Sequence, residues 1–239
     1  MKKVIAFLLI FIGLGVMVYP KAVDLYSAQK QNNLIEDWEN QEYISESTQA
    51  NSNSSNEDTA KNSYINLDSI FNPAAGTAEA AEPDSIEESR QNTEEVEETE
   101  SAEEESKPLS DSMLGIITID KINVKLPILR SASQYHLKYG AGHLSGTVLP
   151  GQKGNSAIAA HRSREYGKMF NRLNEVSVGD AITVNTRDGS YTYKVTDTKI
   201  VKPEDLSVLN NTTGETLTLI TCDTPENPVN RLIIKAQLK

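Results

Sequence analysis

Cysteine is nearly absent from this sequence: Cys222 is the only one in 239 residues. A single cysteine excludes an intramolecular disulfide, and it excludes zinc and iron–sulfur sites that need several cysteines. The sequence signatures of several enzyme classes are also missing. There is no phosphate-binding loop, no His-Glu-x-x-His motif and no Gly-x-Ser-x-Gly motif. The chain has no internal repeat either.

Basic residues are scarce in one half of the chain and modestly abundant in the other. Residues 30–112 carry 22 Asp and Glu against 4 Lys and Arg, whereas residues 113–239 carry 11 against 16. The overall net charge of −11 therefore describes neither half. The small positive excess of the second half argues against a general nucleic-acid binder, because a phosphate footprint needs clustered positive charge. We expect no nucleic-acid partner.

The N-terminus has the features of a membrane anchor. Two lysines precede an uncharged, mostly apolar run from Val4 to Pro20, which is near the lower limit of the roughly 17–25 residues needed to span a bilayer. No good small-x-small cleavage site follows the run. We therefore expect residues 1–29 to form a short cytoplasmic tail and an uncleaved anchor, with the remainder outside the cell. Residues 24–38 are predicted to form an amphipathic helix at the bilayer surface. A cleaved secretory signal is the alternative.

Residues 30–112 form an acidic segment of low complexity. Clusters of Asn, Ser and Thr precede Glu-rich stretches, with too few apolar side chains to offset the entropy of ordering the chain. We predict a disordered, extended stalk that spaces the rest of the protein from the membrane. Glu-rich segments can also be helical, and this alternative stays open. A short apolar island from Tyr64 to Phe71 is interpreted as a chance fluctuation in composition, with transient docking on another surface as the alternative.

From residue 113 the pattern is that of an all-β domain. Short alternating or apolar runs, separated by Gly, Pro, Asn and Asp, predict strands at 116–119, 122–126, 156–160, 181–184, 191–201, 216–221 and 231–238. The dipeptide Asp188-Gly189 predicts a hairpin between two of them. Short helices are predicted at 134–139 and 168–173. Seven or eight strands within residues 113–239 favour a β-barrel or a β-sandwich.

The single cysteine is the first candidate for chemistry. An unpaired cysteine in an exported protein is a buried small apolar residue, a partner for another chain, or a reactive thiol. Cys222 ends a predicted strand, just before a loop rich in Pro, Asp and Asn. A strand end that opens into a loop is where a scaffold displays a reactive group. The position of Cys222 therefore favours the reactive thiol.

Two further candidates for chemistry lie at the ends of predicted strands. If the strands on either side of residues 224–229 are antiparallel neighbours, Cys222 and Arg231 lie together at one end of a sheet face. His161 follows the strand predicted at 156–160. An imidazole can take the proton of a thiol and later protonate a leaving amine, and a guanidinium can stabilise an oxyanion.

Each of these candidates has a plain structural alternative. Arg231 alone is compatible with a solvated charge at a strand edge, and His161 with an exposed loop residue. His143 is a rival base at the start of a predicted turn. His136 lies on a predicted helix and is interpreted as a surface or packing residue.

Three separated motifs resemble the sortase family. The residues from Thr218 to Cys222 match the sortase signature Thr-Leu-x-Thr-Cys. Residues 142–144 together with 154–162 resemble the segment that supplies the sortase histidine, and residues 230–234 resemble the final strand with its arginine. The motifs occur in the family's order, and the resemblance covers residues 113–239.

The resemblance implies an eight-stranded β-barrel with short helices, and a membrane-anchored cysteine transpeptidase of Gram-positive cell surfaces. It makes Cys222 the nucleophile, His161 the acid and base, and Arg231 the stabiliser of the oxyanion or the substrate. His143 falls upstream of the family's catalytic position. Sortases cleave a Leu-Pro-x-Thr-Gly-like motif between Thr and Gly, hold the Thr carbonyl as a thioester and pass it to an amine. The implied partners are surface proteins with a C-terminal sorting signal and a peptidoglycan precursor that carries the amine.

The departures from the family pattern bear on the subtype. Residues 67–73 lack the Asp-Pro-aromatic lid that precedes the barrel of pilus-assembling sortases, and no apolar tail follows Lys239. We therefore expect a protein closer to class D or class A than to the pilin polymerases. We expect no cofactor and no metal, because the calcium site of some relatives has no clear acidic cluster here. Two other functions stay open: a thiol peptidase that only hydrolyses, and a catalytically silent tethered adhesion domain.

Overall fold

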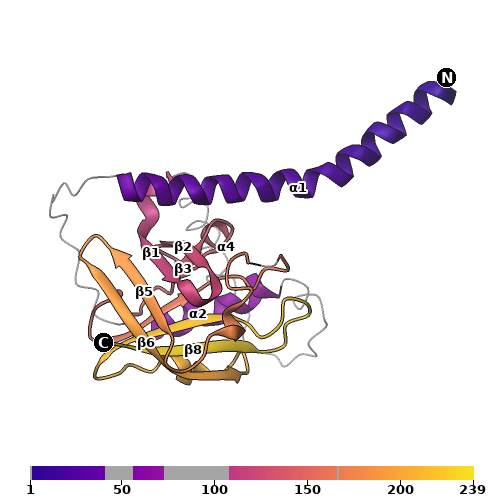
Figure 1. The fold of residues 1–239 in the computed structure, drawn as a ribbon. Helices are drawn as coiled ribbons and strands as arrows, with labels where there is room; N and C mark the ends of the chain where they lie inside the picture. The colour runs from indigo at the N-terminus through magenta and orange to yellow at the C-terminus, as the bar shows by residue number, and fades with distance from the viewer. Residues whose placement is uncertain (1, 41–55, 73–107, 166) are drawn as a thin grey trace, which may run out of the picture.

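The computed structural model describes residues 2–40, 56–72, 108–165 and 167–239 (Figure 1). The remaining parts of the predicted stalk, 41–55 and 73–107, lie outside the described residues. In chain order the elements are α1 (Lys2–Asn40), α2 (Glu57–Phe71), η2 (Leu109–Ser112), β1 (Met113–Ile119), η3 (Asp120–Ile122), β2 (Val124–Leu129), α4 (Gln134–Leu137), β3 (Ala141–His143), β4 (Gly154–Ala159), η4 (Leu173–Glu175), β5 (Ala181–Thr186), β6 (Ser190–Val201), η5 (Leu206–Leu209), β7 (Glu215–Cys222) and β8 (Arg231–Leu238).

The strands close into a barrel with the order β1-β2-β3-β4-β7-β8-β6-β5. The pairs β2–β3 and β4–β7 are parallel, and the other neighbours are antiparallel. The predicted all-β, eight-stranded barrel is thus confirmed. The hairpin predicted at Asp188-Gly189 is confirmed as well, because β5 and β6 pair up to Asn185 and Ser190 on either side of it.

Strand alternation separates the barrel interior from a second buried layer outside it. In β7 and β8 the side chains of Leu217, Leu219, Leu232, Ile234 and Ala236 belong to the interior core. The opposite faces of the same strands carry Ile220, Cys222 and Ile233, and these are buried too, among side chains of α2 and η5. The candidate nucleophile therefore lies on the outer face of the barrel, in a layer that α2 completes.

Two predictions about local structure fail within the domain. The strand β3 was not predicted, because three residues are too few for alternation to be recognised. The helix predicted at 168–173 is wrong. This stretch consists of turns with hydrogen bonds from residue i to i−3, such as Asn171 N to Lys168 O at 3.1 Å, and the positive φ of 50° at Met169 is incompatible with a right-handed helix.

The prediction of an extended stalk over residues 30–112 is wrong for 30–40, which belong to α1, for 109–112, which form η2, and for 57–71, which form α2. The side chain of Asn56 caps the helix by accepting a hydrogen bond from Thr59 N at 3.3 Å. One stripe of the helix is buried, formed by Ala60, Tyr64, Leu67 and Phe71. Packing of this stripe on the barrel supplies stabilisation that an isolated 15-residue helix lacks.

The approach of α2 to the barrel requires a glycine at position 146. Asn56 N donates a hydrogen bond to Gly146 O at 2.9 Å. Gly146 has φ of +85°, and a Cβ atom there would lie 2.4 Å from the backbone nitrogen of Ala60. Any side chain at this position would therefore push the first turn of α2 away from the barrel.

The C-terminal half of α1 packs on the barrel, whereas its N-terminal part extends away from it (Figure 1). Leu34 is buried in a cluster with Leu109, Met113, Ile116 and Leu129. Gln31 Nε2 donates to Tyr139 O at 3.1 Å, and the Arg187 guanidinium lies 3.6 Å from the centroid of the Trp38 ring. The apolar side expected to lie on a bilayer thus packs on the barrel instead. No helix among the described residues is long and apolar enough to cross a membrane.

Candidate active site

The register of β7 and β8 places Cys222 directly beside Arg231. The two strands are antiparallel, and Cys222 and Arg231 are the last pair of the ladder. Both side chains are buried, with 5% of Cys222 and 1% of Arg231 exposed. The pairing assumed from strand alternation is therefore confirmed, whereas the alternative of a solvated charge for Arg231 is wrong.

The parallel pairing of β4 with β7 brings His161 to the same end of the barrel. Ala160 N donates to Ile220 O at 3.1 Å, and Thr221 Oγ1 donates back to Ala160 O at 2.8 Å. His161 is the next residue along the chain. It lines, together with Cys222, a cavity of about 640 Å³. The fold thus brings the thiol and the imidazole into one cavity although 61 positions separate them.

Several distant segments form the walls of this cavity. They are residues 24–31 of α1, Phe71 and Asn72 at the end of α2, residues 123–126, and the loops that follow β4 and β7. No group of three or more His, Cys, Asp or Glu within the described ranges is placed to hold a metal ion.

Arg231 is directed toward α2 and does not line the cavity. Its Nη2 donates to Asp68 Oδ1, and its Nη1 donates to Asn230 O at 3.3 Å. The guanidinium carbon also lies 5.3 Å from the centroid of the Phe71 ring. The Phe71 ring in turn packs on His161, with the ring centroids 5.2 Å apart. The last turn of α2 therefore contacts both the candidate base and the candidate guanidinium.

The comparison with known proteins identifies the family. The family model of the sortase domain matches residues 117–239, which is more than half of the chain. This chain belongs to the sortase family. The chain is 30% identical over 129 residues to sortase A of Listeria monocytogenes, and the match covers 54% of this chain and 58% of the relative. It is 32% identical over 117 residues to sortase D of Bacillus subtilis, and that match covers 48% of this chain and 57% of the relative.

Solved sortase structures share the barrel. Sortase A of Listeria monocytogenes superposes with a TM-score of 0.51 at 31% identity, over 54% of this chain and 88% of that chain. A pilus-related sortase C of Group B Streptococcus superposes with a TM-score of 0.51 at 31% identity, over 54% of this chain and 68% of that chain. The chain spans a little over half the length of the curated relatives named above.

In this sortase, burial favours the neutral forms of both the Cys222 thiol and the His161 imidazole. Burial raises the pKa of Cys222 to about 11, although Arg231 and Arg162 oppose the rise. Burial also lowers the pKa of His161 below its ordinary value. At neutral pH the cavity is therefore lined by a protonated thiol and a neutral imidazole, and a neutral imidazole is the form of histidine that can accept a proton.

The other two histidines of this sortase lie outside the cavity. The His143 Nε2 is 2.9 Å from Val148 O and 3.0 Å from Thr147 Oγ1. Because Thr147 Oγ1 donates its own hydrogen to Leu144 O at 2.8 Å, the Nε2 of His143 carries a proton and donates it. His143 therefore shapes a buried turn and is no rival base. His136, with its Nδ1 2.7 Å from Ser131 Oγ, is 1% exposed and is a packing residue.

Two residues at the site, Asp68 and Phe71, were missed by the sequence analysis. The interpretation of residues 64–71 as a chance fluctuation is wrong, because they form the part of α2 that contacts Arg231 and His161. The helical spacing of the buried stripe, with the capping Asn56 before it, was the available signal.

Proposed function

We propose that this chain is a cysteine transpeptidase that cleaves a Leu-Pro-x-Thr-Gly-like sorting signal through a thioester and transfers the carboxyl part to an amine. One observation carries the proposal. Cys222 is the ladder partner of Arg231 and shares a cavity with His161. Membership of the sortase family supports the same reaction class.

In the first half of the reaction, the sulfur of Cys222 attacks the Thr carbonyl carbon of the sorting signal. Its proton passes to His161, and the carbonyl oxygen becomes an oxyanion that the Arg231 guanidinium stabilises. The bond between carbon and nitrogen then breaks. His161 returns the proton to the leaving Gly amine, and the Thr carbonyl stays on Cys222 as a thioester.

In the second half, an amine replaces the sulfur. The amine nitrogen attacks the thioester carbon and gives its proton to His161, and the bond between carbon and sulfur breaks. The proton then returns to the Cys222 sulfur. The site starts and ends neutral, which fits the opposite pKa shifts that burial causes at Cys222 and His161. Reaction with water in place of the amine gives the hydrolytic alternative.

The last turn of α2 moves away when the substrate binds. Arg231 is 1% exposed and donates to Asp68, so a carbonyl oxygen reaches the guanidinium only after this contact breaks. The Phe71 ring, which packs on His161, leaves at the same step. The described conformation is therefore the closed, resting form of the site.

The cellular setting is part of the proposal and is supported by sequence alone. The uncharged run from Val4 to Pro20 behind two lysines favours an N-terminal membrane anchor with the barrel outside the cell. The partners in that setting are surface proteins with a C-terminal sorting signal, and a peptidoglycan precursor with a free amine.

The experiment that tests the function follows a sorting-signal peptide with and without an added amine. We expect hydroxylamine or a glycine-based amine to yield the amide product, and Cys222→Ala to yield none. Hydrolysis alone at every amine concentration identifies a thiol peptidase and overturns transfer. The absence of any reaction and of any adduct on Cys222 identifies a silent adhesion domain and overturns the proposal altogether.

A further inference from the structure

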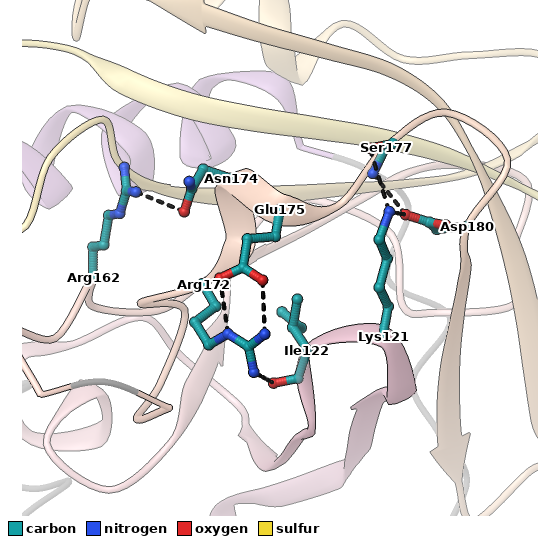
Figure 2. Close-up of polar contacts among 8 residues, drawn as sticks. All are labelled: Lys121, Ile122, Arg162, Arg172, Asn174, Glu175, Ser177 and Asp180. Carbon is teal, nitrogen blue, oxygen red and sulfur yellow. Dashed lines mark hydrogen bonds and ion pairs between the residues drawn. The ribbon is translucent and has the colours of Figure 1, made fainter.

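Arg162 forms several hydrogen bonds around the candidate site that no sequence motif indicated. Its Nη1 donates to Asp223 O and, at 3.4 Å, to Cys222 O. Its Nε donates to Asn171 O at 3.2 Å, and its Nη2 donates to Asn174 Oδ1 at 2.7 Å. One half-buried guanidinium thus joins the end of β7 to the loop that follows β4. Figure 2 shows its hydrogen bond to Asn174.

These contacts connect the backbone of Cys222 to the segment that begins at His161. Arg162 itself follows His161 directly, and the carbonyls it holds belong to Cys222 and to the next residue. A guanidinium is suited to this task because its donors lie in a rigid plane and can reach several acceptors at once. From the geometry of these contacts we infer that Arg162 is a positioning residue, which fixes the Cys222 thiol relative to the His161 imidazole.

The loop around Arg162 is anchored independently elsewhere. Arg172 donates to both carboxylate oxygens of Glu175, at 2.8 and 2.7 Å, and to Ile122 O at 3.3 Å. Lys121 donates to Asp180 at 2.7 Å, at the end of the same loop. Figure 2 shows these contacts together with the hydrogen bond from Arg162 to Asn174. The loop can therefore keep its fold when Arg162 is replaced, while the end of β7 loses its attachment to it.

The charge of Arg162 has a second effect on the thiol. The Arg231 and Arg162 guanidinium groups both oppose the rise that burial causes in the pKa of Cys222. The Arg231 guanidinium is paired with Asp68, whereas the Arg162 guanidinium donates a hydrogen bond to the backbone of Cys222 itself. Removal of the positive charge is therefore expected to raise the pKa of the thiol.

The test compares Arg162→Gln and Arg162→Lys with Arg172→Gln as the matched control. Arg172 lies in the same loop, and its guanidinium donates to Glu175 and to Ile122 O. Unfolding curves of the full chain establish that each variant folds. The pH dependence of Cys222 alkylation by iodoacetamide measures the thiol without any peptide, and kcat and KM for the sorting-signal peptide measure the reaction.

We expect Arg162→Gln to lower kcat at least tenfold with KM changed less than twofold, and to shift the alkylation profile to higher pH. Arg162→Lys restores the alkylation profile, because the charge is kept, but not kcat, because an ammonium cannot bridge the same acceptors. Arg172→Gln leaves both readouts as in the wild type. Wild-type kcat and alkylation in Arg162→Gln, or the same losses in Arg172→Gln, overturn the inference.

The positioning role rests on the proposed function, and the two can fail separately. If the wild type does not turn over any sorting-signal peptide, the proposed function fails. The alkylation profiles of the same variants still decide whether Arg162 lowers the pKa of the Cys222 thiol. A shifted profile in Arg162→Gln supports that control, and an unshifted one contradicts it.

Discussion

Asp68 accepts a hydrogen bond from the Arg231 guanidinium across 163 positions of sequence, and the two side chains form an ion pair. The Arg231 side chain is 2% exposed and that of Asp68 is 48% exposed. A half-exposed carboxylate is easily hydrated when it separates from the guanidinium. A substrate group that competes for the guanidinium can therefore break the pair. The buried guanidinium, in contrast, needs a partner at all times, which either Asp68 or the substrate oxyanion can supply.

Replacing Asp68 by Ala is expected to increase the reactivity of Cys222. The substitution removes the contact that holds the last turn of α2, and it removes a negative charge that raises the pKa of the thiol. We expect alkylation of Cys222 by iodoacetamide at pH 7 to become severalfold faster, and its midpoint to fall below the pKa of about 11 of the closed form. Asp58→Ala, in the exposed first turn of the same helix, is the control. An alkylation rate equal to that of the control contradicts the proposed closed form.

The docking of α2 can be tested from the barrel side with a pair of glycine substitutions. Gly146→Ala introduces a Cβ atom 2.4 Å from Ala60 N, whereas Gly179→Ala, at φ of +99°, meets only Lys194 Cε at 3.9 Å. Both changes impose left-handed backbone strain of about 1–2 kcal/mol. Only Gly146→Ala should also release α2 and accelerate alkylation of Cys222. Equal acceleration in both variants would show that strain alone, and not the position of α2, controls access to the thiol.

The stability of the domain is expected to fall between pH 7.5 and 5.5. Burial lowers the pKa of His143 and of His161 below the ordinary value of 6.5, so the unfolded chain takes up protons that the folded chain does not. The contribution of each histidine to the free energy of unfolding is therefore fully present above pH 6.5. It is lost as the pH falls below this value, by at most about 1.4 kcal/mol per pH unit.

Urea unfolding at a series of pH values measures this loss. The variant His161→Gln has one titrating histidine fewer and should lose less stability over the same range. A free energy of unfolding that is constant from pH 7.5 to 5.5 in the wild type, or a loss that is undiminished in His161→Gln, contradicts the burial of a neutral imidazole at the site.

The placement of Cys222 beside Arg231 could be predicted because it follows from the alternation of side chains along strands. Residues two apart in a strand share a face, and a short loop joins antiparallel neighbours, so the positions of Cys222 and Arg231 relative to each other were fixed by local pattern. The parallel partner strand that delivers His161 is not local, and it was reached through the resemblance to sortases. Periodicity alone left the position of His161 open.

The remainder of the site depends on contacts that leave little trace in the sequence. The stripe of α2 is embedded in an acidic segment whose average composition predicts disorder, and only packing on the barrel stabilises it. Three of the acceptors of Arg162 are backbone carbonyls, which every residue type provides, so no motif indicates them. The turn at 168–173 has helical composition, but the conformation of Met169 is set by its surroundings.

The most direct test of the central claim is the intact mass of the full chain after brief mixing with a sorting-signal peptide. We predict a mass increase equal to the peptide portion that ends at Thr, formed on Cys222 and discharged by hydroxylamine. The increase should be absent in Cys222→Ala and much reduced in Arg231→Lys, because a lysine lacks the planar fork of the guanidinium. An adduct that persists in Cys222→Ala, or a wild type that forms none while the peptide is consumed, contradicts thioester chemistry at this site.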